Sequence, residues 1–217
     1  MKVLIVVDPQ NDFVHTQGKL SIANAGDVID NINKLLISPK FDMKIITQDW
    51  HPQNHMSFAY THGKEVFTLN EKMPAGDGYT VIDQMMWPNH CVANSWGAQI
   101  YKTINQYYVD MIIRKGVNID RENYSFLEYV VGGGVDNFAT TEYYNMFRTL
   151  QAEYFICGYA TDYCVKQTAY SIRNHLDKEV TIITDAVKGV NEEESQKWLL
   201  QSWNKAAQWI KKTEEVI

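Results

Sequence analysis

Short apolar runs alternate with segments of helical hydrophobic spacing along most of the chain. Continuous apolar runs rich in β-branched residues predict buried strands at Val3–Val7, Met43–Thr47, Val109–Arg114, Tyr154–Gly158 and Val180–Thr184. Apolar residues spaced three or four positions apart predict helices over 22–36, 140–150, 165–175 and 192 to about 211. Strands that alternate with helices are typical of an open, doubly wound, mostly parallel sheet with helices on both faces. We therefore expect an α/β fold.

Length and composition narrow the class of protein. The chain has 217 residues, with no repeats or linkers, so we expect one domain over 1–217. Apolar residues make up 45% and charged residues 21%, which is ordinary for a globular enzyme. The net charge of −6 and the lack of a basic cluster longer than Lys211–Lys212 argue against nucleic acid or an anionic membrane as a partner.

The cellular compartment follows from the apolar segments and the cysteines. The opening run Val3–Val7 is too short for a signal-peptide core, and no membrane-length apolar segment follows it. The three cysteines contain no CxxC pair, so neither a disulfide scaffold nor a thioredoxin-type site is expected. We expect a cytoplasmic protein.

The segment 154–165 combines a predicted strand, a tight turn and a cysteine. The apolar run ends at Gly158, and helical spacing begins just after Cys164. Thr161 and Asp162 occupy positions typical of helix N-caps. Free backbone N–H groups and the helix dipole would favour the thiolate of Cys164 at that position. Cys164 is a candidate nucleophile, and the alternative interpretation is a small core residue.

Polar residues follow the predicted strands, at Asp8, Asp49, Lys115 and Asp185. In an open parallel sheet, ligands bind beyond the carboxyl ends of the strands, so these side chains would meet at one rim. Strand ends are often polar because they meet water, which explains any one of them. A thiol nucleophile needs a base and a cation, and Asp8 and Lys115 are the candidates. The N–H groups of Ala160 and Cys164 are candidates for an oxyanion hole.

A second group of polar residues lies in a long irregular segment, about 49–96. Asp49 and His51 are two positions apart, so in an extended chain their side chains point to the same side. His90 would complete a set of one oxygen and two nitrogen ligands, which suits Zn, Mn or Fe with open positions. The DxH pattern alone is weak, because loop histidines are usually solvated.

Other residues of this segment are weaker candidates. His55 is a candidate fourth ligand and ranks above His62, and Cys91 beside the third ligand is less favoured. Phe13, Trp87 and Tyr159 could offer aromatic faces to a flat substrate. The simpler explanation for any one aromatic residue is packing in the core.

Several motifs, in this order, cover nearly the whole chain: Val7–Phe13, Thr47–Pro52, Trp87–Val92, Arg114–Gly116, Asp120 with Tyr124–Phe126, and Gly158–Val165. With them the sequence resembles the nicotinamidase branch of the isochorismatase-like cysteine hydrolase superfamily. The resemblance implies the triad Asp8, Lys115 and Cys164, and the metal ligands Asp49, His51 and His90, to which some members add a residue corresponding to His55. It also implies a cis peptide at Tyr159–Ala160, an oxyanion hole of the Ala160 and Cys164 amides, and an aromatic pocket that includes Phe13 and Trp87. The sequence departs from the family at Tyr159, where an aliphatic residue is common.

The resemblance implies hydrolysis of nicotinamide to nicotinate and ammonia through a cysteine thioester, in NAD salvage. It implies one divalent metal ion per chain, with zinc favoured over manganese and iron, that positions a small aromatic carboxamide. One alternative is a metal-independent relative that acts on a carbamoyl or ureido compound, against which the Asp/His/His set argues. Another is a catalytically silent binding domain of the same fold. The tryptophan-bearing C-terminal segment would pack on the core or on a second copy, so a homo-oligomer is compatible with the sequence.

Overall fold

The computed structural model describes residues 1–74, 81–127, 138–202 and 209–217. Its centre is a six-stranded sheet with the order β5-β2-β1-β6-β7-β8, in which every neighbouring pair is parallel. The strands are β1 (Lys2–Val7), β2 (Met43–Asp49), β5 (Met111–Lys115), β6 (Glu153–Tyr159), β7 (Val180–Lys188) and β8 (Trp209–Lys211). This arrangement confirms the predicted mostly parallel α/β sheet.

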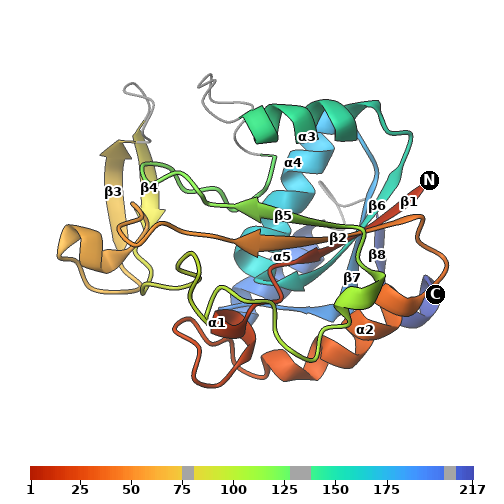
Figure 1. The fold of residues 1–217 in the computed structure, drawn as a ribbon, viewed down its shortest axis with the longest axis horizontal. Helices are drawn as coiled ribbons and strands as arrows, with labels where there is room; N and C mark the ends of the chain where they lie inside the picture. Colours follow the sequence, from red (N-terminus) through yellow and green to blue (C-terminus); the bar gives the residue numbers. More distant parts are fainter. Residues whose placement is uncertain (75–80, 128–137, 203–208) are drawn as a thin grey trace.

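Helices cover both faces of the sheet. Figure 1 shows α2 on one side and α3 with α4 on the other. The α-helices are α1 (Asn11–Val14), α2 (Ile29–Ile37), α3 (Phe138–Thr149), α4 (Lys166–Leu176) and α5 (Glu192–Ser202). Shorter turns are the 3₁₀ segments Ala25–Val28, Ala59–His62, Gln106–Tyr108 and Thr213–Glu215, and the π turn Thr161–Val165.

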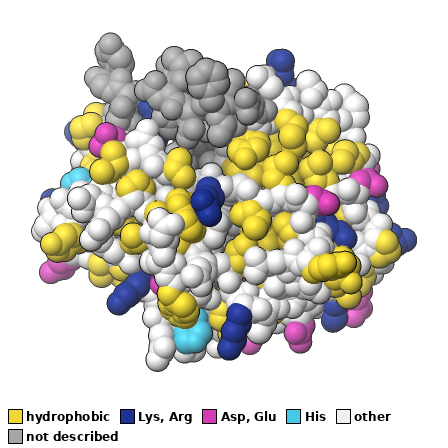
Figure 2. All heavy atoms as spheres, in the orientation of Figure 1, with side chains coloured by type: hydrophobic (Ala, Val, Ile, Leu, Met, Phe, Trp, Pro, Cys, Tyr) yellow, Lys and Arg dark blue, Asp and Glu magenta, His cyan; other side chains and the backbone are white. Residues whose placement is uncertain are grey.

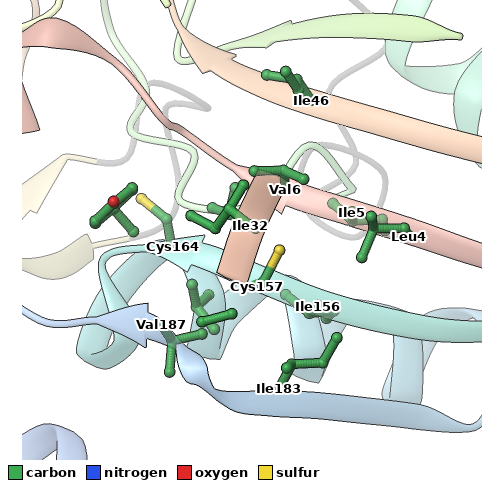
Figure 3. Packing of buried hydrophobic residues seen from close by; sticks show 14 of the residues in the cluster. Leu4, Ile5, Val6, Ile32, Ile46, Ile156, Cys157, Cys164, Ile183 and Val187 are labelled. Atoms are coloured by element: carbon green, nitrogen blue, oxygen red, sulfur yellow. The ribbon is translucent and has the colours of Figure 1, made fainter. Parts of the chain in front are cut away.

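The hydrophobic core lies between the sheet and these helices. All of Val3–Val7 is fully buried, as expected for a central strand covered on both faces. Helix α2 turns Ile32, Leu35 and Leu36 into the core, and all three are fully buried. Figure 3 shows Cys157 among the labelled core residues of several strands, with Cys164 lying apart toward the end of the sheet. Cys157 is thus a core residue, as its place in an apolar strand predicts.

Two predicted helix boundaries are wrong. Helix α2 begins at Ile29, because the preceding Ala25–Val28 forms a 3₁₀ turn. The last helix, α5, ends at Ser202 rather than near Lys211, and Trp209–Lys211 forms the edge strand β8. The predicted helical positions Trp203 and Ala206 lie outside the described residues. A strand of three residues is too short to show an alternating pattern, so helical spacing extended across it.

The segment expected to be irregular contains an antiparallel pair, β3 (Leu69–Pro74) and β4 (Val81–Met85). Most side chains of β3 are exposed, so the pair has little apolar signal in the sequence. Figure 1 shows this pair standing to one side of the main sheet. Residues 75–80 of the same segment lie outside the described residues.

The molecular surface mixes polar and apolar groups. On the face viewed in Figure 2, hydrophobic side chains form several patches separated by charged and other polar atoms. Among the described residues, no helix has both the length and the apolar character needed to cross a bilayer.

Candidate active site

The parallel sheet brings the carboxyl ends of β1, β2 and β5 to one edge. Asp49 ends β2 directly beside Lys115 at the end of β5, and the two are register partners. Asp8 follows β1 with a left-handed backbone, φ 45°, and Gln10 N donates to its carbonyl at 2.8 Å. The chain therefore turns sharply after β1, which leaves the Asp8 carboxylate at the strand end.

The Lys115 ammonium lies at the centre of this group. Its Nζ atom is 2.8 Å from Asp8 Oδ2, 2.5 Å from Asp49 Oδ1 and 3.3 Å from Cys164 Sγ. All four residues are buried. Asp8, Asp49 and Cys164 are close enough together to hold a metal ion, but the Lys115 ammonium already supplies a cation there. The predicted nucleophile, base and cation thus lie in one hydrogen-bonded group.

Burial sets the protonation of the two reactive groups. It raises the pKa of Asp8 to about 6, although the Lys115 ammonium opposes the shift. Burial also raises the pKa of Cys164 well above its usual range, again against the effect of Lys115. Burial therefore opposes the thiolate that the helix terminus was expected to favour. The Cys164 thiol therefore needs a base within hydrogen-bond range to remove its proton, and the Asp8 carboxylate is the neighbouring base.

The predicted caps do not cap the helix that carries the nucleophile. A π turn, Thr161–Val165, precedes α4, and no side chain caps it. Asp162 instead accepts hydrogen bonds from Val190 N at 3.0 Å and Asn191 N at 2.8 Å. Its carboxylate therefore fastens the loop after β7 to the turn that carries Cys164.

The turn between β6 and the π turn approaches β1 closely. Gly158 has φ +109°, and a Cβ atom there would overlap the backbone of Val7. The peptide bond between Tyr159 and Ala160 is cis, as the resemblance implies. Ala160 and Cys164 both line the pocket described below, which is the location an oxyanion hole formed by their amides requires.

Asp49, His51 and His90 converge as a candidate metal centre. Asp49 Oδ2 is 3.6 Å from His51 Nε2 and 4.0 Å from His90 Nε2. The other ring nitrogens hydrogen-bond to backbone carbonyls, His51 Nδ1 to Gly116 at 2.9 Å and His90 Nδ1 to Pro88 at 2.8 Å. Because a carbonyl can only accept, each Nδ1 carries the hydrogen and each Nε2 faces the shared centre.

The charges at this centre also fit a cation. Burial lowers the pKa of His51, but the Asp49 carboxylate and other neighbours together raise it by more, and the net shift is upward. Positive charge is therefore favoured beside Asp49. Burial, with His51 nearby, lowers the pKa of His90 to about 4, so this ring is a neutral ligand. The donor set therefore fits one divalent ion.

Two buried supports hold the first ligands in place. The Gln10 amide donates to Asp49 O and accepts from Asp49 N, both at 2.8 Å, which fixes the backbone of this ligand. Gly116 has φ +61°, and a Cβ atom there would overlap the His51 ring. Glycine is needed at this position so that the Gly116 carbonyl can reach His51 Nδ1. Gln10 belongs to the Val7–Phe13 motif, but no sequence signal assigns it this contact.

His55 lies behind the metal centre. Its Nδ1 is 2.8 Å from Ser57 Oγ and its Nε2 is 2.9 Å from Arg121 O, so both ring nitrogens already have partners. The ring packs against His51 with centroids 4.2 Å apart. This placement favours support of His51 over the predicted role as fourth ligand.

Glu122 is a buried carboxylate that the sequence analysis missed. Its Oε2 is 3.9 Å from His55 Nδ1, and its side chain is only 5% exposed. With His51 and His55 it forms a second group of potential metal ligands. It follows no strand end and forms no motif with the other ligands, so the sequence offers no signal for it.

Three other sequence candidates lie elsewhere. His62 Nε2 hydrogen-bonds to Met56 O at 2.8 Å, and the fully buried Cys91 has its Sγ 3.9 Å from Gly97 O. Asp185 Oδ1 accepts from Thr213 N at 2.8 Å, so Asp185 does not join the rim. Strand β7 continues past it to Lys188, which is why it is not a strand end.

A narrow pocket joins the two groups. Its lining residues are Phe13, Leu20, Asp49, His51, Trp87, His90, Glu122, Tyr124, Ala160, Tyr163, Cys164 and Val190. The free volume is about 20 Å³, enough for a water molecule, so the pocket is narrow. Phe13 and Trp87 line it as expected.

Tyr159 does not match its predicted place in this pocket. Its hydroxyl donates to Ala25 O at 2.7 Å, and the side chain is fully buried in the core. Tyr124 and Tyr163 line the pocket instead, and the Tyr163 ring meets Trp87 edge-on with centroids 4.7 Å apart. Tyr163 is the neighbour of the nucleophile in sequence and belongs to the Gly158–Val165 motif, but neither fact assigns its ring to the pocket.

A buried cysteine, carboxylate and lysine at the edge of a parallel sheet, beside an Asp/His/His centre, define a hydrolase-like site. The chain belongs to the isochorismatase domain family, whose model matches residues 2–215. A curated relative is the nicotinamidase of Saccharomyces cerevisiae, 34% identical over 203 residues, which cover 89% of this chain and 90% of the relative.

Solved structures agree with this assignment. The yeast nicotinamidase Pnc1p superposes with a TM-score of 0.84 and 30% identity, covering 98% of this chain and 100% of that one. PnC1 from L. infantum in complex with nicotinate superposes with a TM-score of 0.79 and 28% identity, covering 100% of this chain and 95% of that one. A pyrazinamidase of Pyrococcus horikoshii in complex with zinc superposes with a TM-score of 0.71 and 29% identity, covering 97% of this chain and 98% of that one.

Proposed function

We propose that this protein is a nicotinamidase, which hydrolyses nicotinamide to nicotinate and ammonia. The observation that carries the proposal is the position of the Lys115 ammonium, 2.8 Å from the Asp8 carboxylate and 3.3 Å from the Cys164 sulfur, at the end of an aromatic pocket. An aromatic carboxamide has the flat ring that such a pocket accepts and the electrophilic carbon that a cysteine attacks.

The first half of the reaction forms a thioester. Asp8 takes the thiol proton of Cys164, and the sulfur attacks the carboxamide carbon. The amides of Ala160 and Cys164 stabilise the oxyanion, while the Lys115 ammonium balances the charge that moves between Asp8 and the sulfur. Protonated Asp8 then gives its proton to the amide nitrogen, which leaves as ammonia when the carbon–nitrogen bond breaks.

The second half restores the enzyme. Asp8, again a carboxylate, takes a proton from water as the water oxygen attacks the thioester carbon. The carbon–sulfur bond breaks, nicotinate is released, and the Cys164 sulfur recovers the proton from Asp8. A pKa of about 6 suits Asp8 for both steps, because the group can gain and lose a proton near neutral pH.

Asp49, His51 and His90 would hold one divalent metal ion, for which we propose zinc. When bound, the ion supplies a positive anchor for the pyridine nitrogen and so positions the ring. The zinc complex of the Pyrococcus horikoshii pyrazinamidase supports this choice. The donor set also accepts manganese and iron.

The same proposal covers the wider setting. Residues 1–217 would act as one catalytic domain in the cytoplasm, and the substrate would be nicotinamide or a similar aromatic carboxamide. Release of nicotinate would return the pyridine ring to NAD synthesis.

Product stoichiometry tests the proposed function. Purified protein loaded with zinc is incubated with nicotinamide, and ammonia and nicotinate are both quantified. We expect one ammonia for each nicotinate, and no hydrolysis of carbamoyl or ureido compounds under the same conditions. Hydrolysis of a carbamoyl or ureido compound without any nicotinamide turnover would favour the metal-independent alternative. Nicotinamide binding without turnover would favour a silent binding domain.

A further inference from the structure

The Tyr124 hydroxyl is a polar group in the pocket to which the reaction assigns no role. Tyr124 lies on the segment after β5, and its side chain lines the same pocket as Cys164 and the metal centre. Trp87 Nε1 is 3.0 Å from the Tyr124 oxygen, and Gln84 Nε2 is 3.1 Å from it. Both contacts connect this oxygen to neighbours on or beside β4.

The direction of both hydrogen bonds is fixed by chemistry. An indole nitrogen can only donate, so Trp87 donates to Tyr124. The Gln84 nitrogen also lies 2.8 Å from Met85 O, and a carbonyl can only accept. The Gln84 side chain must therefore present its NH₂ group to both partners, and it donates to Tyr124 as well.

Two donors occupy the lone pairs of the Tyr124 oxygen. A hydroxyl has two acceptor sites and one hydrogen to donate, so the Tyr124 hydrogen must point elsewhere. Within 1–74, 81–127, 138–202 and 209–217, the structure records no acceptor for that hydrogen. Burial, with the Glu122 carboxylate nearby, raises the pKa of Tyr124 well above its usual range, so the hydroxyl keeps its hydrogen.

We propose that Tyr124 is a substrate-orienting hydrogen-bond donor, whose hydrogen Gln84 and Trp87 direct into the pocket toward the oxygen of the bound carboxamide. The proposal rests on the proposed function. A partly buried donor that lacks a partner is unfavourable, so the pocket favours ligands that present an acceptor to Tyr124 and disfavours rings that lack one.

A pair of variants at Gln84 tests whether the Tyr124 hydroxyl hydrogen points into the pocket. Gln84→Glu replaces the donor with an acceptor of the same size, which draws the Tyr124 hydrogen away from the pocket. Gln84→Met removes the donor without adding an acceptor, so the hydrogen remains free to point inward. We expect the KM for nicotinamide to rise about tenfold in Gln84→Glu and in Tyr124→Phe, and clearly less in Gln84→Met.

A matched control exists outside the pocket. Tyr170 accepts a hydrogen bond from Trp198 Nε1 at 3.0 Å, the same distance as in the Trp87–Tyr124 pair. Tyr170→Phe removes an equivalent hydroxyl and should leave the KM unchanged. Thermal melting of every variant reports loss of folding, which a change in KM alone does not.

The outcomes separate this inference from the proposed function. If Gln84→Glu and Gln84→Met raise the KM equally, or if Gln84→Glu leaves it unchanged, Tyr124 is only a pocket wall and the inference is overturned. Absence of ammonia release by the metal-loaded wild-type protein would overturn the proposed function and this inference together.

Discussion

The two halves of the site are built from different parts of the fold. Asp8 and Lys115 follow or end hydrogen-bonded parallel strands, and Cys164 lies in the π turn that follows β6. His90, Glu122 and Tyr124 instead lie on connecting segments outside the strands and helices. The sheet fixes the reacting groups relative to one another, whereas loops position Trp87, Tyr124 and two of the metal ligands, His51 and His90.

Asp49 belongs to both halves. Its Oδ1 atom contacts the Lys115 ammonium and its Oδ2 atom faces His51 and His90. Burial opposes ionisation, but Lys115, with His51 beside it, holds the pKa of Asp49 well below its usual range. One carboxylate therefore connects the reacting groups with the metal centre, and the two halves should respond differently to substitution except at this residue.

Replacement of the nucleophile should have the largest effect. Cys164→Ala removes the only atom that forms the thioester, so ammonia release should fall by about ten-thousand-fold or more. Nicotinamide binding, measured by calorimetry, should remain because the pocket walls and metal centre are unchanged. Cys157→Ala, in the core, is the control and should retain activity. Ammonia release by Cys164→Ala at a substantial fraction of the wild-type rate would rule out the thioester mechanism.

The next largest effects should come from substitution of two metal ligands: Asp49, which also contacts Lys115, and His90, which does not belong to the reacting group. His90→Ala removes one ligand, so metal affinity should fall about 100-fold or more, with activity partly restored by excess zinc. Asp49→Asn should lose metal as well and resist restoration, because Lys115 also loses a charged partner. Metal content and ammonia release measure both effects.

The control for these ligand variants is His62→Ala, which lies outside the metal centre. Thermal melting separates loss of metal from loss of folding. Equal restoration of Asp49→Asn and His90→Ala by zinc would contradict the dual role of Asp49.

A support of the metal centre should have a smaller effect. His55→Gln removes the ring that packs on His51, and metal affinity should weaken about tenfold. The same substitution should leave the reaction rate of the fully loaded protein close to that of the wild type. Complete loss of metal at saturating zinc would instead make His55 a ligand, as first expected from the sequence.

The smallest effect concerns the acidity of the base. Only the carboxylate form of Asp8 accepts the thiol proton, so kcat/KM should fall about tenfold per pH unit below about pH 6. Thr47 donates to Asp8 Oδ1 at 2.7 Å, which stabilises the carboxylate and lowers its pKa. Thr47→Val should therefore move the acid limb to higher pH by about half a unit. A limb that stays in place, or moves to lower pH, would contradict the assignment of Asp8.

The reacting half of the site could be predicted from the sequence for a physical reason. Asp8 and Lys115 stand directly after strong apolar runs, and parallel strands present their carboxyl ends on one edge. Asp185 follows such a run too, but its strand continues beyond it, and the pattern could not reveal that continuation. Strand β8 is too short for any period to identify.

The loop half was predicted only in part. His51 and His90 could be named from residue type and from motifs. Glu122 lies in no motif, and Tyr124 lies in one, but the turns that bring both to the pocket have no periodicity in the sequence. Tyr159 stands next to Ala160 in sequence, yet its side chain enters the core and donates to Ala25. Neighbours in a tight turn can face opposite ways, which sequence adjacency does not reveal.

Asp49 should connect the reacting groups with a metal centre that the reaction needs. The most direct test of this connection is ammonia release from nicotinamide before chelation, after chelation and after metal is restored. Metal content is measured at each stage. We predict that activity is lost as the metal is removed and returns with zinc, while Cys164→Ala stays inactive at every stage. Full activity in protein shown to be free of metal would contradict the account and reduce the Asp49, His51 and His90 centre to a structural cluster.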